Sequence, residues 1–126
     1  MKKIELDSEE SFNIIEIGSD KYTLEKVVSH LPCSQNIYCI NPNKRDLDDL
    51  EDFFRNNNKV NFKKLNFALA DVPGKKTLHV TKDDSASSVY EPNYKILKRY
   101  RSTTTIFDVV EKKEIQCENL DNVFFR

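Results

Sequence analysis

Apolar and polar positions follow two different periods along the first half of the chain. The run NIIEI at 13–17 is short, apolar and rich in β-branched residues, which predicts a buried strand. In the segment that follows, four apolar residues recur at helical spacing: Leu24, Val27, Val28 and Leu31. Pro32 ends this segment, so the pattern predicts a strand, a turn at 18–20 and one amphipathic helix.

The pattern of a strand followed by a helix is repeated once more, and the segments after it predict strands. A second apolar run at 36–41 predicts a strand, and Asn43 is a suitable N-cap for a second helix. One face of that helix carries Leu47, Leu50, Phe53 and Phe54, and its many acids predict a solvated opposite face. Residues 60–71 predict a third strand. A tight turn at 72–75, a partly exposed fourth strand at 76–81 and one or two later strands complete the pattern.

The order strand–helix–strand–helix–strand predicts an α/β fold with a parallel sheet in spatial order 3-2-1, followed by a β-hairpin extension. Ligands of such folds bind at the carboxyl ends of the strands. This rule places Gly18, Asn41 and the region around Ala68 on one rim. We expect a loose polar lead-in at 1–11 and one domain at 12–126.

Composition and charge narrow the classes of function. Hydrophobic residues make up 38% and charged residues 33% of the 126-residue chain, and the net charge is −1. We therefore expect a cytoplasmic protein with no nucleic-acid or membrane partner, since no apolar run approaches a membrane span and no signal peptide begins the chain. The basic segment KILKRYRS at 95–102 is interpreted as a solvated loop or short helix rather than a nucleic-acid patch.

The cysteines and histidines provide few candidates for a disulfide, a metal site or a catalytic base. The three cysteines form no CxxC pair, so we expect neither a disulfide framework nor a metal site, and Cys39 is interpreted as a small buried hydrophobe. His30 and His79 are the two imidazoles available as a base. His79 lies in the alternating segment 76–81, which predicts a surface or half-buried position.

The turn at 18–20 leaves three interpretations open. A dinucleotide-binding loop carries G-x-G-x-x-G, with an acid about 20 residues later for the ribose hydroxyls. This chain has Gly18 alone, and Asn41 stands where the acid belongs. The loop is therefore a working cofactor site, a worn one, or a purely structural turn, and spacing alone favours the last.

Five segments, in order, resemble the FkbM family of S-adenosylmethionine-dependent methyltransferases. IIEIGS resembles the family's first motif at the end of strand 1, and INPN resembles the segment that ends strand 2. NFALADVPGKKTLHV is similar to strand 3 with its hairpin, SASSVYEPN to a Ser-Ser-Leu segment, and IQCENLD to the start of a Leu-Asp helix. The resemblance implies a partial Rossmann-like class I methyltransferase fold that binds S-adenosylmethionine.

The resemblance also assigns cofactor contacts at the first motif. Glu16 matches the acid near the methionine end of the cofactor, where its carboxylate accepts from the ammonium group. Gly18 lets the backbone pass close to the cofactor. Ser19 offers a backbone N–H or its hydroxyl. Lys21 and Tyr22 depart from the family pattern by adding bulk at the start of the helix.

Other matched positions lie on the second and third strands. Asn41 stands in place of the glutamate that binds the ribose, and the loss of its paired charged hydrogen bonds costs about 2–3 kcal/mol. Ala68 and Leu69 match the loop that flanks the adenine. Ser87 and Ser88 match the serine pair, to which no role is assigned.

The family pattern continues beyond the last residue of this chain, with a fourth strand that pairs with strand 1. The resemblance therefore implies a truncated domain whose strand at 13–17 has an unpaired apolar edge. We expect that edge to be covered by a second copy, by a complementing chain or by the later segments of this chain.

Two functions remain open. The first is an S-adenosylmethionine-dependent methyltransferase that methylates a hydroxyl of a sugar or other small metabolite, with no residue assigned as its catalytic base. The second is a non-catalytic, methyltransferase-like interaction module or degenerate remnant. A dehydrogenase fragment fits less well, because its glycine pattern is also absent.

Overall fold

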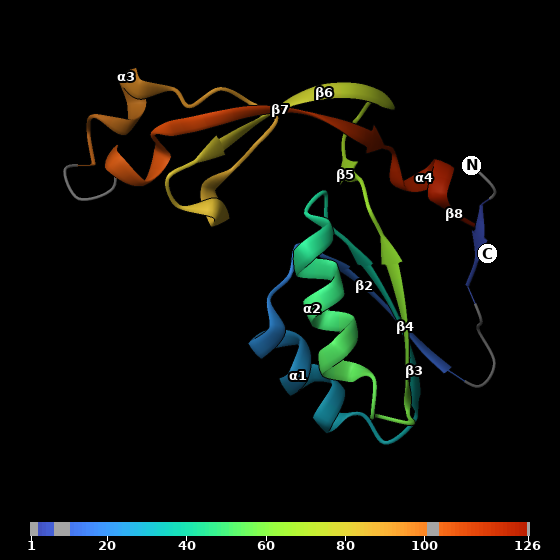
Figure 1. The fold of residues 1–126 in the computed structure, drawn as a ribbon. Helices are drawn as coiled ribbons and strands as arrows, with labels where there is room; N and C mark the ends of the chain where they lie inside the picture. The colour runs from blue at the N-terminus through green and yellow to red at the C-terminus, as the bar shows by residue number, and fades with distance from the viewer. Residues whose placement is uncertain (1–2, 7–10, 101–103, 126) are drawn as a thin grey trace. The chain divides into compact units, whose positions relative to one another are not determined.

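The structure is a computed structural model that describes residues 3–6, 11–100 and 104–125 (Figure 1). The chain divides into two compact units, each described by itself. Unit 1 comprises Met1–Pro73 and Cys117–Arg126, and unit 2 comprises Gly74–Gln116.

A parallel three-stranded sheet forms the centre of unit 1. Its strands are β2 (Ser11–Ile17), β3 (Ser34–Ile40) and β4 (Val60–Leu65), in the order β2-β3-β4. Helix α1 (Lys21–His30) connects β2 to β3, and α2 (Lys44–Phe54) connects β3 to β4. The predicted α/β fold and the predicted strand order 3-2-1 are therefore confirmed.

Local sequence explains where both helices begin. The Asp20 carboxylate accepts from the Thr23 backbone N–H at 3.1 Å and caps α1. The Asn43 side chain likewise accepts from the Arg45 N–H at 3.1 Å and caps α2. Both helices cover one face of the sheet, where seven residues form a buried cluster: Leu24, Val28, Ile37, Cys39, Leu47, Leu50 and Phe54.

Three members of the predicted apolar helix faces lie outside that cluster: Val27, Leu31 and Phe53. Val27 and Phe53 are exposed, whereas Val28 and Phe54 beside them are buried. An apolar stripe on a helix is wider than its contact with the sheet, so residues at the edge of the stripe stay in contact with solvent.

The opposite face of the sheet is covered by the two ends of the described chain. β1 (Ile4–Glu5) pairs in parallel with β8 (Phe124–Phe125), and α4 (Leu120–Val123) precedes β8. A second buried cluster joins these ends to the sheet and consists of Tyr38, Ile40, Phe67, Val123 and Phe124. Part of the segment expected as a loose lead-in is therefore a strand, because Ile4 packs against this cluster.

The predicted third strand, 60–71, is divided in the structure. β4 ends at Leu65, and a separate strand, β5 (Ala68–Leu69), pairs in parallel with Cys117–Glu118 at the end of β7 (Val109–Glu118). The Phe67 side chain is buried in the second cluster, which redirects the chain between the two strands.

The predicted β-hairpin extension is wrong in its pairing. β5 and β6 (Gly74–Thr81) do not pair with each other, because β7 is the hydrogen-bonded neighbour of each. Pro73 has no backbone N–H to donate to a hairpin ladder, and the ten-residue β7 supplies both partners instead.

Unit 2 contains β6, the first eight residues of β7 and three short helical segments. These segments are η1 (Asp84–Ala86), α3 (Tyr94–Leu97) and η2 (Thr104–Phe107). His79 in β6 forms an antiparallel bridge with Ser88, and its side chain is buried. The prediction of a surface or half-buried His79 is therefore wrong, since the segment that returns at Ser88 was not anticipated.

Candidate functional site

Gly18 and Asn41 lie at the same edge of the sheet, as the strand order predicted. The Gly18 N–H donates to the Ile40 carbonyl at 2.9 Å, and the Asn41 N–H donates to the Leu65 carbonyl at 3.1 Å. Each of these bonds extends the parallel ladder by one residue past the carboxyl end of its strand. We call this edge, with Glu16, Gly18, Ser19 and Asn41, the carboxyl rim (Figure 1).

The conformation of Gly18 requires glycine. Its φ is +107°, a value that residues with a Cβ rarely adopt. A Cβ built at this position would meet no other atom within 4 Å, so the space beside the Gly18 backbone is open. The turn therefore combines a backbone conformation that favours glycine with room for a ligand to approach it closely.

Glu16 supplies a half-buried carboxylate just before Gly18. Burial raises its pKa above the ordinary value of 4.5, and a hydrogen bond from the Asp20 backbone offsets part of that rise. The negative charge of Asp20 raises the pKa of Glu16 further. A cation near this carboxylate would relieve the cost of burying its charge.

Three other groups lie near Glu16. The Asp46 carboxylate adds negative charge, and the Ser19 hydroxyl and the Cys39 thiol are hydrogen-bond donors. The Ser19 hydroxyl donates to the Asp46 carboxylate at 3.5 Å. The Cys39 thiol donates to the Gly18 carbonyl at 3.2 Å. Burial, with the charges of Glu16 and Asp46, raises the pKa of Cys39 to about 12, so this thiol stays protonated.

Asn41 is buried and already holds the turn that leads into α2. Its side-chain oxygen accepts from the Asn43 N–H at 2.8 Å. Its backbone carbonyl accepts from the side-chain amide of Asn66 at 3.0 Å. A ribose hydroxyl would have to share that side-chain oxygen, through its second lone pair.

Sequence reasoning missed Asn66. Its amide also donates to the Pro42 carbonyl at 3.1 Å, so one side chain closes the gap between the ends of β3 and β4. The available signal was a polar residue between the apolar positions Leu65 and Phe67. A continuous third strand would have explained that alternation equally well.

The other predicted site residues lie elsewhere. Ala68 and Leu69 pair with Cys117 and Glu118, and Leu69 packs against the second buried cluster. In unit 2 the Ser87 hydroxyl accepts from the Thr81 N–H at 3.1 Å. Four of the six predicted cofactor residues thus gather at the carboxyl rim, whereas Ala68 pairs within a strand and Leu69 both pairs and packs against the second cluster.

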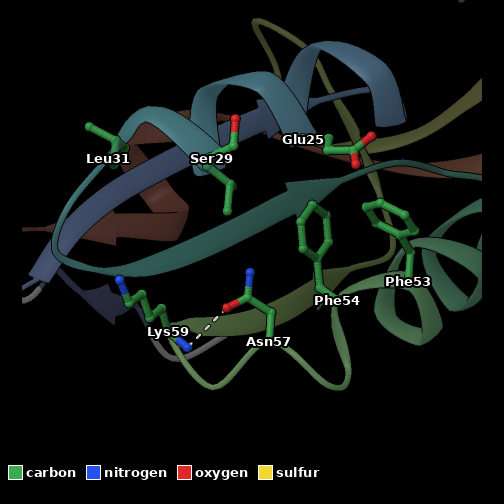
Figure 2. A pocket seen from close by; sticks show the side chains of 8 residues that line it. Glu25, Ser29, Leu31, Phe53, Phe54, Asn57 and Lys59 are labelled. Carbon is green, nitrogen blue, oxygen red and sulfur yellow. Dashed lines mark hydrogen bonds between the residues drawn. The ribbon is translucent and has the colours of Figure 1, made fainter.

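A cavity of about 330 Å³ lies at the opposite end of the sheet, between the ends of α1 and α2 (Figure 2). Phe54 and Asn57 line it from α2 and the loop that follows, and Lys59 precedes β4. Figure 2 shows the Asn57 side chain accepting from the Lys59 N–H, at 3.1 Å. The cavity is therefore separate from the carboxyl rim that the sequence predicted.

Comparisons with known proteins leave the family open, because no family model, no curated protein and no solved structure matches the chain. Among the described helices, none has the length and apolar character needed to cross a membrane. Within the described ranges, no group of three or more His, Cys, Asp or Glu side chains is placed to hold a metal ion.

Proposed function

We propose that the chain is a cytoplasmic, Rossmann-like class I methyltransferase domain of FkbM type. In this proposal it binds S-adenosylmethionine at the carboxyl rim and serves transfer of a methyl group to a hydroxyl of a sugar or other small metabolite. The observation that carries the proposal is the open, positive-φ turn at Gly18, two residues after Glu16 and at the carboxyl end of the parallel strand β2.

The residues at the rim fit the methionine end of that cofactor. Glu16 presents a carboxylate whose pKa burial raises, and Asp20 and Asp46 lie near the same turn. Such a region favours the ammonium and sulfonium charges of S-adenosylmethionine. Gly18 leaves space for close approach, and the Ser19 backbone lies at the start of α1.

The carboxyl rim fits the ribose of S-adenosylmethionine less tightly than it fits the methionine end. Asn41 has one side-chain oxygen, which the Asn43 N–H already uses, so it would accept one ribose hydroxyl rather than grip two. The cofactor would supply the methyl group, and the residues of the rim would hold it in line with the acceptor oxygen. No described residue at the rim is assigned as the base for that oxygen.

A second candidate function is a non-catalytic interaction module. β2 lies at the edge of its described sheet, and Phe12 and Ile17 are 51% and 64% exposed. Exposed apolar residues on an edge strand favour pairing with a second copy or with a complementing chain. The internal use of the Asn41 oxygen favours the same function, since it weakens the cofactor site.

Calorimetric titration with S-adenosylhomocysteine distinguishes the two functions. The enzyme proposal expects micromolar binding that Glu16→Gln weakens, because the variant removes the partner of the ammonium group. The matched control, Glu25→Gln, changes the cavity at the other end of unit 1 and should bind like the unmodified chain.

Absence of binding at millimolar ligand, from a sample shown to be folded by circular dichroism, would overturn the enzyme proposal. Light scattering on the same sample then measures self-association. A concentration-dependent dimer would support the interaction module.

A further inference from the structure

The net charge of −1 is the sum of the charges of two units, and these unit charges have opposite signs. Unit 2 carries nine Lys and Arg residues against six Asp and Glu, whereas unit 1 carries eleven against fifteen. The sequence-based expectation of no nucleic-acid partner rested on the charge of the whole chain and on the interpretation of the basic segment 95–102 as a solvated loop or short helix. Because unit 2 has an excess of basic residues of its own, a nucleic-acid partner has to be considered for that unit separately.

The basic excess of unit 2 gathers around α3. Residues 92–107 carry four basic side chains and no acid. Three of these basic residues are described, and all three are exposed: Lys95, Lys98 and Arg99. None of the three pairs with an acid among the described residues, whereas Lys75 pairs with Glu114 at 2.9 Å in the same unit.

Exposed tyrosines lie on both sides of these cations in the sequence. Tyr90 is 73% exposed and Tyr100 is 61% exposed, and Tyr94 between them is also exposed. Large aromatic side chains are usually buried, at least in part, so three exposed rings within eleven residues require an explanation. We call these three tyrosines, with Lys95, Lys98 and Arg99, the tyrosine–lysine surface.

Helical turns hold the part of the tyrosine–lysine surface from Tyr94 to Tyr100 in a defined arrangement. The Lys98 N–H donates to the Tyr94 carbonyl at 3.1 Å, and the Tyr100 N–H donates to the Leu97 carbonyl at 2.9 Å. Residues four apart share one side of a helix, so Lys98, which caps α3, lies beside Tyr94. Arg99 continues the turn, and its N–H donates to the Ile96 carbonyl at 3.1 Å. The Tyr94 hydroxyl donates to the Phe107 carbonyl at 3.3 Å, which restrains its ring.

We propose that the tyrosine–lysine surface binds single-stranded nucleic acid. Lys95, Lys98 and Arg99 would neutralise backbone phosphates, and the exposed tyrosine rings would stack on unpaired bases. Cations beside exposed aromatic rings suit single strands, since every base offers a ring face and every nucleotide a phosphate. A four-residue helix is too short to read a duplex groove, which favours the single strand.

This inference is independent of the proposed methyltransferase function, because it concerns residues of unit 2 alone. An acidic protein is the other macromolecule that a basic surface attracts. The tyrosines favour nucleic acid over it, because stacking on bases uses the ring faces whereas a charged peptide chain needs only the cations.

Fluorescence anisotropy of the whole chain with fluorescein-labelled oligothymidylate of 15 nucleotides tests the proposal. We expect a dissociation constant of about 10⁻⁴ to 10⁻⁵ M at 50 mM salt. Three phosphate contacts predict a slope of log K against log salt near about −2 for a single strand. Tyr100→Ala should weaken binding about tenfold through lost stacking.

The controls separate stacking from charge. Tyr22→Ala removes an equally exposed tyrosine from unit 1 and should leave binding unchanged. Lys98→Glu should weaken binding and flatten the salt slope, whereas Lys26→Glu on α1 should do neither. Circular dichroism confirms that each variant is folded.

Three results would overturn the proposal. The first is no binding at millimolar chain at 50 mM salt. The second is binding that tracks charge reversals but is unaffected by Tyr90→Ala and Tyr100→Ala together. The third is equal competition by polyglutamate of matched charge, which would assign the surface to an acidic protein instead.

Discussion

The Tyr38 ring meets the Phe124 ring edge to face, with 5.3 Å between their centroids and 81° between their planes. Tyr38 lies in the central strand β3, and Phe124 lies at the start of β8. This contact joins the last described strand to the face of the sheet that the helices leave uncovered. The C-terminal segment is therefore part of the core of unit 1.

Phe124→Ala tests that conclusion. Removal of a buried aromatic side chain should lower the free energy of unfolding by about 3–5 kcal/mol, because it leaves a cavity against Tyr38. Urea denaturation followed by circular dichroism measures the change. Leu120→Ala is the control: this exposed side chain of α4 should change stability by less than about 0.5 kcal/mol. Equal effects of the two variants would contradict a packed C-terminal segment.

Gly18→Ala should destabilise unit 1 through its backbone alone. No atom lies within 4 Å of the added Cβ, but φ of +107° strains any residue with a side chain. We expect a loss of about 1–3 kcal/mol in the free energy of unfolding. Ser19→Ala, beside it, is the control and should have a smaller effect. An unchanged midpoint in urea for Gly18→Ala would mean that the turn relaxes freely.

Glu16→Gln should raise stability at neutral pH and leave it unchanged in acid. Burial raises the pKa of Glu16 above 4.5, so the folded state favours the protonated form. Its contribution is fully present below the unfolded pKa and is lost as pH rises through the folded pKa. The amide avoids that loss and should gain a few tenths of a kcal/mol, since the carboxyl is only partly buried. Thermal melts at pH 4 and pH 7 compare the variants, and a gain at pH 4 that equals the gain at pH 7 would refute the assignment.

Lys64→Met should raise the pKa of Asp48. The Lys64 ammonium lies 2.8 Å from the Asp48 carboxylate and 3.0 Å from that of Glu51. Hydrogen bonds from Lys64 and then Lys44 hold the pKa of Asp48 below 3.8. That stabilisation is present above the unfolded pKa and is lost as pH falls through the folded pKa.

NMR titration of the Asp48 carboxyl carbon measures the shift directly. Lys63→Met, at the neighbouring position of β4, is the matched control and should leave the Asp48 pKa in place. A titration of Asp48 that is identical in Lys64→Met and the unmodified chain would exclude the ion pair in solution.

Cysteine reactivity should divide the three thiols into two classes. Cys33 is exposed and should react with iodoacetamide in the native chain. Cys39 and Cys117 are buried, and burial raises the pKa of Cys39 to about 12, so both should react only after unfolding. Mass spectrometry of the alkylated chain counts the modified thiols. Two modified thiols before unfolding would show that one of the buried positions opens.

The sequence determined the elements whose signals are local. Apolar runs and helical spacing located β2, β3, α1 and α2, and Asn43 marked the start of α2. Alternation of strands and helices then determined the parallel order, because short connections leave few other arrangements. The same order placed Gly18 and Asn41 on one rim.

Tertiary structure decided what depends on distant partners. β7 pairs with β5, and β8 pairs with β1, although the paired residues Ala68 and Cys117 are 49 positions apart in the chain, and Ile4 and Phe124 are 120 positions apart. No periodicity within a segment tells which distant strand will cover its apolar face or complete its ladder. The engagement of Asn41 by Asn43 and Asn66, and the burial of His79 beside Ser88, were decided in the same way, by residues that the fold brings together.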